Sequence, residues 1–182
     1  LPGKSTVKGD FSCSVVAPLS EALELTRDRL FVDLDTKTDR IDLVVAEIEK
    51  AGLVDQVFIS VSDYQKAVEA RALNANIRIQ VRPDTPEEFQ LILEALERPP
   101  EIVEIPVTQI ASMSESIHAI GAKVFTDAWS ADAHAYIEGN FDKYIALFED
   151  GADVAQSELV PLLLKSLGRW NFDDQGLSKS EE

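Results

Sequence analysis

Strand-like and helix-like segments alternate along this chain, and that alternation limits the possible folds more than any other feature. Each predicted strand is followed by a helical pattern of apolar residues, as in Ile41, Val44, Val45 and Ile48. Tandem β–α units of this kind imply parallel strands joined by right-handed crossovers. The six predicted strands are 31–36, 57–61, 77–82, 102–107, 123–128 and 153–157.

The length and composition predict one domain. With 182 residues, of which 45% are hydrophobic, the chain can bury a core of its own. We expect this single domain over residues 1–170 and a polar tail over 171–182. A short helix is predicted at 20–25, and a looser segment is predicted between Trp129 and the helix around Phe141.

The charge of the chain excludes several classes of partner. The 17 Lys and Arg residues stand against 33 Asp and Glu residues, which gives a net charge of −16. Nucleic acid and anionic lipid repel such a surface, so neither is predicted as a main partner.

No apolar run approaches the roughly 20 residues of a membrane span. The one cysteine, Cys13, excludes an internal disulfide but does not fix the compartment.

Two layouts fit the alternation: an open doubly wound sheet or a closed β/α barrel. Strands of a doubly wound sheet are covered on both faces and read as nearly continuous apolar runs. Here polar and apolar residues alternate, with Arg78, Gln80 and Arg82 on one face of the third strand. In a barrel these side chains point inward, towards the C-terminal ends of the strands where barrel active sites lie. The pattern therefore favours an α/β, TIM-barrel-like fold, although about six units fall short of eight.

Charged side chains at the end of the first predicted strand form the main candidate site. Asp33, Asp35 and Lys37 share one face of the strand and are costly to bury without partners. One interpretation is a cation bound by the two carboxylates, with Lys37 contacting an anion such as phosphate; such oxygen ligands suit Mg²⁺ or Ca²⁺. The other is an ion-pair network with Arg78 and Arg82 inside the barrel. The residues alone do not decide between the two.

Five further residues have side chains that could take part in binding or catalysis. Arg78 and Arg82 can grip a phosphate, or they can neutralise the two carboxylates, which is the favoured interpretation. Trp129 follows the fifth strand and is expected at the C-terminal end of the barrel, either walling a pocket or simply packing. His118 is predicted as a surface or packing residue. His134 is expected in a loop, with no acid or base partner at a fixed spacing.

The order of five segments resembles the C-terminal two-thirds of the glycerophosphodiester phosphodiesterase family. Asp33 to Lys37 resembles the family's strand that ends Glu-x-Lys, and Ala17 to Leu23 resembles its "PTLEEAL" helix start. Three further stretches are similar to the family's "ISSFD", "H-x-x-G-x-x-V" and "GADIIQTDRP" motifs: 57–63, 117–125 and 151–161.

This resemblance implies a function and several site residues. Members of the family are TIM barrels that use a divalent cation to hydrolyse a glycerophosphodiester into glycerol 3-phosphate and an alcohol. Asp35 stands at the position of a metal-binding glutamate, and Lys37 at that of a phosphate-contacting lysine. Trp129 falls near a pocket-lining aromatic. Arg82 is a further candidate for substrate binding, as in other barrels that handle phosphate.

The departures from the family are equally informative. The opening His-Arg-Gly, the Glu-x-Asp metal pair and the His-Asp acid/base step are not in this chain, and Asp35 replaces a glutamate. The resemblance therefore implies a chain that begins after the second strand of the barrel. We expect no catalytic residue and no hydrolysis by this chain alone, and a missing N-terminal segment or a second copy as the partner that completes the barrel. The alternative is a non-catalytic relative with a binding or structural role.

Overall fold

The computed structural model describes residues 15–169, which form six strands alternating with helices. The strands are β1 (Val32–Asp35), β2 (Val57–Val61), β3 (Arg78–Val81), β4 (Ile102–Glu104), β5 (Lys123–Asp127) and β6 (Val154–Gln156). The helices are α1 (Leu19–Thr26), α2 (Ile41–Ala51), α3 (Tyr64–Leu73), α4 (Pro86–Ala95), the 3₁₀ helix η1 (Val107–Gln109), α5 (Ile110–Ala119), α6 (Trp129–Glu138), α7 (Asp142–Glu149) and α8 (Val160–Ser166).

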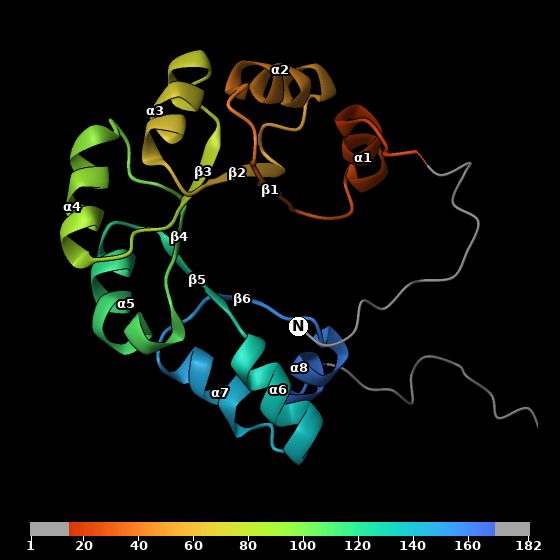
Figure 1. Ribbon diagram of the computed structural model, residues 1–182, viewed down its shortest axis with the longest axis vertical. Coiled ribbons are helices and arrows are strands. Elements are labelled where there is room, and N and C mark those ends of the chain that lie inside the picture. Colours follow the sequence, from red (N-terminus) through yellow and green to blue (C-terminus); the bar gives the residue numbers. More distant parts are fainter. Residues whose placement is uncertain (1–14, 170–182) are drawn as a thin grey trace, which may run out of the picture.

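All six strands are parallel, and each pairs with its successor in the order β1-β2-β3-β4-β5-β6. Figure 1 shows the strands on the inner side of a curve and the helices around its outside. A doubly wound sheet reverses its strand order and carries helices on both faces, so that alternative is wrong. The barrel-like prediction is confirmed as a curled half-barrel. In the described part of the chain, β1 and β6 each have a strand neighbour on one side only.

Alternation along the strands separates a helix-covered face from an inner, concave face. Ile79 and Val81 of β3 are fully buried in the core beneath the helices. Gln80 lies between them and faces the concave side, with Arg82 two residues further along. The core is thus built from one face of the sheet and the inner faces of the helices, which leaves polar side chains to line the concave side.

Local signals set several element ends. The helix predicted from Ile41 to Ala51 has those bounds, and Gly52 closes it in the left-handed region with φ 67°. At the start of α4, the Thr85 side chain accepts a hydrogen bond from the Glu88 N–H at 3.1 Å, and Pro86 occupies the first turn.

Two sequence-based boundaries were wrong. The segment predicted as loose after Trp129 is helix α6, and its buried positions are the small or polar residues Ala131, Asp132 and Ala135, which give little apolar periodicity. The fourth strand ends at Glu104 rather than at 107, because Pro106 and η1 follow it. The predicted tail at 171–182 lies outside the described residues, as does Cys13.

Within residues 15–169, no helix is both long and apolar enough to span a bilayer.

Candidate functional site at the carboxyl ends of the strands

The candidate site lies at the carboxyl ends of the six strands, a region called the mouth from here on. The register of the sheet places Asp35 beside Ser60, Ser60 beside Gln80, and the Asp127 end of β5 beside Gln156. All of these side chains belong to the concave face. The topology therefore gathers at one end of the half-barrel several polar residues that are far apart in the sequence.

Arg82 is the centre of the polar contacts at the mouth. Its Nε atom contacts Glu104 Oε2 at 2.5 Å, and its Nη2 atom lies 3.9 Å from Asp35 Oδ1. Gln80 is completely buried beneath this pair, and its Nε2 donates hydrogen bonds to Glu104 Oε2 at 2.6 Å and to Ser60 Oγ at 3.0 Å. The network prediction for Arg82 is therefore correct, but its closest acidic partner is Glu104.

Arg78 belongs to a different neighbourhood. It lies at the amino end of β3 and forms a 3.5 Å ion pair with Asp55, which is almost fully exposed. The structure thus separates the two arginines that the sequence grouped together. Of these two arginines, Arg82 lies at the mouth and Arg78 does not.

Lys37 stands at the outer rim of the mouth. Its Nζ atom contacts Asp35 Oδ1 at 2.6 Å, and its side chain is 72% exposed while that of Asp35 is 46% exposed. Asp35 thus has two cationic neighbours, Lys37 and Arg82, on the same carboxylate oxygen. A hollow of about 450 Å³ runs along β1 here and is lined by Asp33, Asp35 and Lys37, among others.

Asp33 lies two residues earlier on the same strand, is also exposed, and is affected by all of these charges. Loss of hydration is the largest effect, and together with the nearby carboxylates of Asp35 and Glu104 it raises the pKa of Asp33 to about 6, although Arg82 and Lys37 act in the opposite direction. A carboxyl group whose pKa is raised in the folded state binds its proton more tightly there than in the unfolded chain. Its ionisation therefore reduces stability as the pH rises from about 4 to about 6.

Replacement of this carboxyl should consequently stabilise the protein at neutral pH. We expect Asp33→Asn to raise the free energy of unfolding by up to about 1 kcal/mol at pH 7.5 and to have little effect at pH 4, since the side chain still meets solvent and the gain is reduced by screening. Urea denaturation at both pH values measures it. Asp150→Asn, which changes an exposed carboxyl at the carboxyl end of α7 and away from the mouth, is the control for the general effect of removing one negative charge. An equal gain at both pH values would contradict the explanation.

Trp129 and the two histidines have different surroundings. Trp129 begins α6 at the mouth and is 67% exposed, and its main-chain N–H donates a hydrogen bond to Asp127 Oδ1 at 2.7 Å. His134 lies in α6 rather than in a loop, and its Nδ1 is 2.8 Å from the Ser130 carbonyl oxygen. The expectation that it has no acidic partner at a fixed spacing was wrong, because its Nε2 lies 3.9 Å from Glu138 Oε1, one helical turn later. His118 lies at the opposite end of the sheet, partly exposed as expected, with its Nε2 2.7 Å from Asp153 Oδ2.

The described residues do not by themselves fit a divalent cation at Asp35. Nowhere in residues 15–169 do three His, Cys, Asp or Glu side chains come together in a way that could hold a metal ion. Asp35 Oδ1 is already in contact with the Lys37 ammonium. A Mg²⁺ or Ca²⁺ ion needs about six oxygen ligands. Any such site would therefore need ligands from outside the described residues.

The loop after β6 forms another side of the mouth, and a buried carboxylate holds it. Asp132 of α6 is only 5% exposed and accepts hydrogen bonds from Tyr144 Oη at 2.6 Å, Ser157 Oγ at 2.7 Å and the Glu158 N–H at 2.8 Å. Burial, followed by the hydrogen bond to Asp132, raises the pKa of Tyr144 to about 12. The Asp132 side chain thus links α6 to α7 and to the loop after β6.

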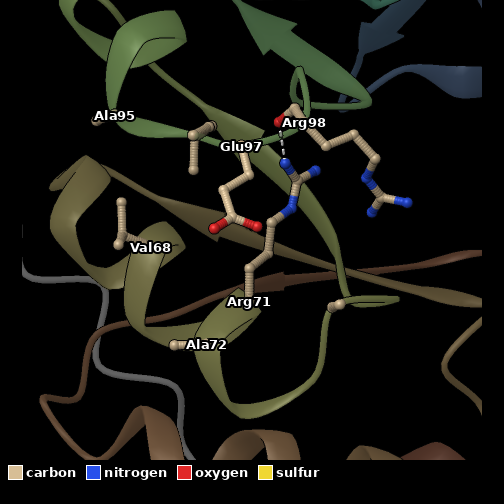
Figure 2. Close-up of a pocket in the computed structure, with 8 residues that line it drawn as sticks. Val68, Arg71, Ala72, Ala95, Glu97 and Arg98 are labelled. Atoms are coloured by element: carbon tan, nitrogen blue, oxygen red, sulfur yellow. Dashed lines mark hydrogen bonds between the residues drawn. The ribbon is translucent and has the colours of Figure 1, made fainter.

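A hollow of about 390 Å³ lies at the opposite end of the half-barrel, between α3 and α4. Figure 2 shows Arg71 reaching across it to the main chain at Arg98. Arg71 is 9% exposed, and its Nη2 also donates to the Pro99 carbonyl oxygen at 3.0 Å and to Glu101 Oε2 at 2.9 Å. These bonds fix the α4–β4 loop, so we interpret Arg71 as a structural residue.

Sequence reasoning missed Glu104 and Asp132. Glu104 could have been found, because it interrupts the apolar strand at an inward position between Val103 and Ile105. Asp132 gave no signal, since its partners lie on another helix and on a loop 12 to 26 residues away.

Comparisons with known proteins bear on the fold. No protein-family model and no curated protein matches the sequence. Among solved structures, the chain is similar to a glycerophosphoryl diester phosphodiesterase from Parabacteroides distasonis, with a TM-score of 0.72 and 17% identity over 82% of this chain and 54% of that one. The chain therefore shares the fold of about half of that structure. At this identity the likeness establishes the fold alone.

Two further solved structures agree. Both proteins are provisionally assigned as glycerophosphodiester phosphodiesterases. The one from Galdieria sulphuraria has a TM-score of 0.66 at 14% identity and covers 82% of this chain and 62% of that one. The one from Silicibacter pomeroyi has a TM-score of 0.60 at 14% identity and covers 84% and 58%. The chain thus spans little more than half the length of these three structures, which agree with the family resemblance seen in the motifs.

Proposed function

We propose that this chain binds glycerophosphodiesters or their phosphate-bearing products at the mouth of its half-barrel. The proposal rests mainly on the ammonium group of Lys37 at the rim. This group is exposed to solvent, so a phosphate can reach it directly. The fold shared with three phosphodiesterases supports this choice of ligand. Arg82 adds positive charge behind Lys37, and Trp129 supplies an exposed aromatic surface on the β5 side.

Hydrolysis would then require a completed barrel. Among the residues that the structure describes, β1 and β6 each have one strand edge without a neighbour, and further strands can extend such edges. We propose that a segment outside the described residues, or a second copy of the chain, completes the ring and brings the acid/base groups and most ligands of a divalent cation. We propose Asp35 as a ligand of that cation in the completed assembly, once Lys37 has moved to the phosphate.

A non-catalytic binding role is the second candidate. The contact between Arg82 and Glu104 at 2.5 Å favours it, because the mouth neutralises much of its own charge. Both candidate functions include phosphate binding at the mouth, but only the first includes hydrolysis of the phosphodiester.

Phosphate binding can be tested with Lys37. We expect Lys37→Met to weaken the binding of glycerol 3-phosphate about tenfold, which corresponds to about 1.4 kcal/mol. Isothermal titration calorimetry at low salt measures the affinity. Lys50→Met is a matched control, since Lys50 is also 72% exposed and also pairs with a carboxylate, Glu47 at 3.2 Å, but lies on α2. Equal losses in both variants, or no binding by the unmodified chain, would refute the proposal.

A further inference from the structure

Two carboxylates from two strands flank a single guanidinium on the concave face, and a third carboxylate lies nearby on one of these strands. Asp33 and Asp35 come from β1, Glu104 from β4, and Arg82 follows β3 between them. Arg82 Nε is 2.5 Å from Glu104 Oε2, and Arg82 Nη2 is 3.9 Å from Asp35 Oδ1. Asp33 lies within the field of the same arginine and of both other carboxylates.

The charges of this cluster nearly balance without an added ion. The three carboxylates carry three negative charges at neutral pH when all are ionised, and Arg82 and Lys37 carry two positive charges. A guanidinium keeps its charge throughout the accessible pH range and presents several donors to surrounding oxygens. A divalent cation that enters between Asp35 and Glu104 would have to displace Arg82 or remain beside its positive charge.

We propose that Arg82 takes the place of a divalent cation among the carboxylates at the mouth. This inference deepens the proposed function, on which it rests, because it implies that the chain as it stands binds a phosphate at Lys37 without a metal. Arg82 is then a built-in counter-ion that positions Glu104 and Asp35. The cation proposed for a completed barrel would bind only after the guanidinium moves away.

The test is the response of the full chain to Ca²⁺ at constant ionic strength, followed by calorimetry and by the thermal unfolding midpoint. We expect the unmodified chain to show no change in the midpoint up to millimolar Ca²⁺. Arg82→Gln should unfold at a lower temperature in EDTA and recover with Ca²⁺, with an affinity at least tenfold higher than that of the unmodified chain. The double variant with Glu104→Gln should lose this gain.

Arg78→Gln is the matched control, since Arg78 lies on the same face of β3 but pairs with exposed Asp55 at the other end. It should stay insensitive to Ca²⁺. An Arg82→Gln protein that binds Ca²⁺ no better than the unmodified chain would overturn the inference and leave Arg82 as an ordinary ion-pair partner. Tight Ca²⁺ binding by the unmodified chain would also overturn it.

A second variant covers the case in which Arg82→Gln does not fold. Arg82→Met removes the charge but keeps an unbranched apolar stem that can pack in place of the arginine stem, and we expect it to bind Ca²⁺ at least threefold more tightly than the unmodified chain; no gain would count against the inference. Glycerol 3-phosphate binding is measured separately in EDTA. If the unmodified chain does not bind glycerol 3-phosphate, the proposed function is wrong. The Ca²⁺ affinities of the variants test the role of Arg82 independently of that result.

Discussion

Asp132→Ala is expected to lower the free energy of unfolding by about 2–4 kcal/mol. The substitution removes the acceptor of three hydrogen bonds, from the buried Tyr144 hydroxyl and from the partly buried Ser157 hydroxyl and Glu158 N–H. Buried donors without acceptors are costly because they have lost water and gained nothing in return. Equilibrium urea denaturation of the unmodified chain and the variant measures the difference.

Two other variants make this test specific. Tyr144→Phe removes only one of the three hydrogen bonds and should cost about 1 kcal/mol. Asp150→Ala removes an exposed carboxylate near the end of α7 and should change stability by less than about 0.5 kcal/mol. If Asp132→Ala were no more harmful than Asp150→Ala, the account of Asp132 as the link between α6, α7 and the loop after β6 would be wrong.

The second large effect concerns catalysis. We expect the purified chain, supplied with Mg²⁺ or Ca²⁺, to hydrolyse glycerophosphocholine no faster than buffer. General acid–base catalysis contributes about 10²- to 10⁴-fold for each positioned group. The chain has only two histidines: His118 is paired with Asp153 at the far end of the sheet, and His134 contacts the main chain of its own helix.

An enzyme-coupled assay for released glycerol 3-phosphate provides the measurement, with a complete phosphodiesterase as the positive control. Turnover that depends on the cation and on this chain would show that the catalytic groups are already present. Activity that appears only after a strand-bearing segment is added would support the completed barrel.

The sequence predicted the architecture well because that information is local. Ile41 to Ala51 forms a helix with the expected bounds, since its apolar stripe and Gly52 act within a few residues. The inward position of Gln80 and Arg82 follows from simple alternation along a strand. Both features can be read from residues that are close in the sequence, so no knowledge of distant contacts is needed.

The partners within the site were harder to predict because they depend on register. Arg82 could be placed on the concave face, but its closest carboxylate, Glu104, comes from the next strand and 22 positions later. The helix starting at Trp129 was missed because it buries alanines and Asp132, whose partners become visible only in three dimensions. Periodicity reports which face a residue occupies, and it does not report which neighbour it meets.

Chemical-shift mapping of glycerol 3-phosphate on the ¹⁵N-labelled chain tests the central claim most directly. We expect the amide signals that move to cluster at the mouth, at Lys37, Arg82 and Trp129, with the signals around Arg71 and Arg98 unchanged. Shifts confined to the hollow between α3 and α4, or no shifts at millimolar ligand, would contradict the account of the mouth as a phosphate-binding site.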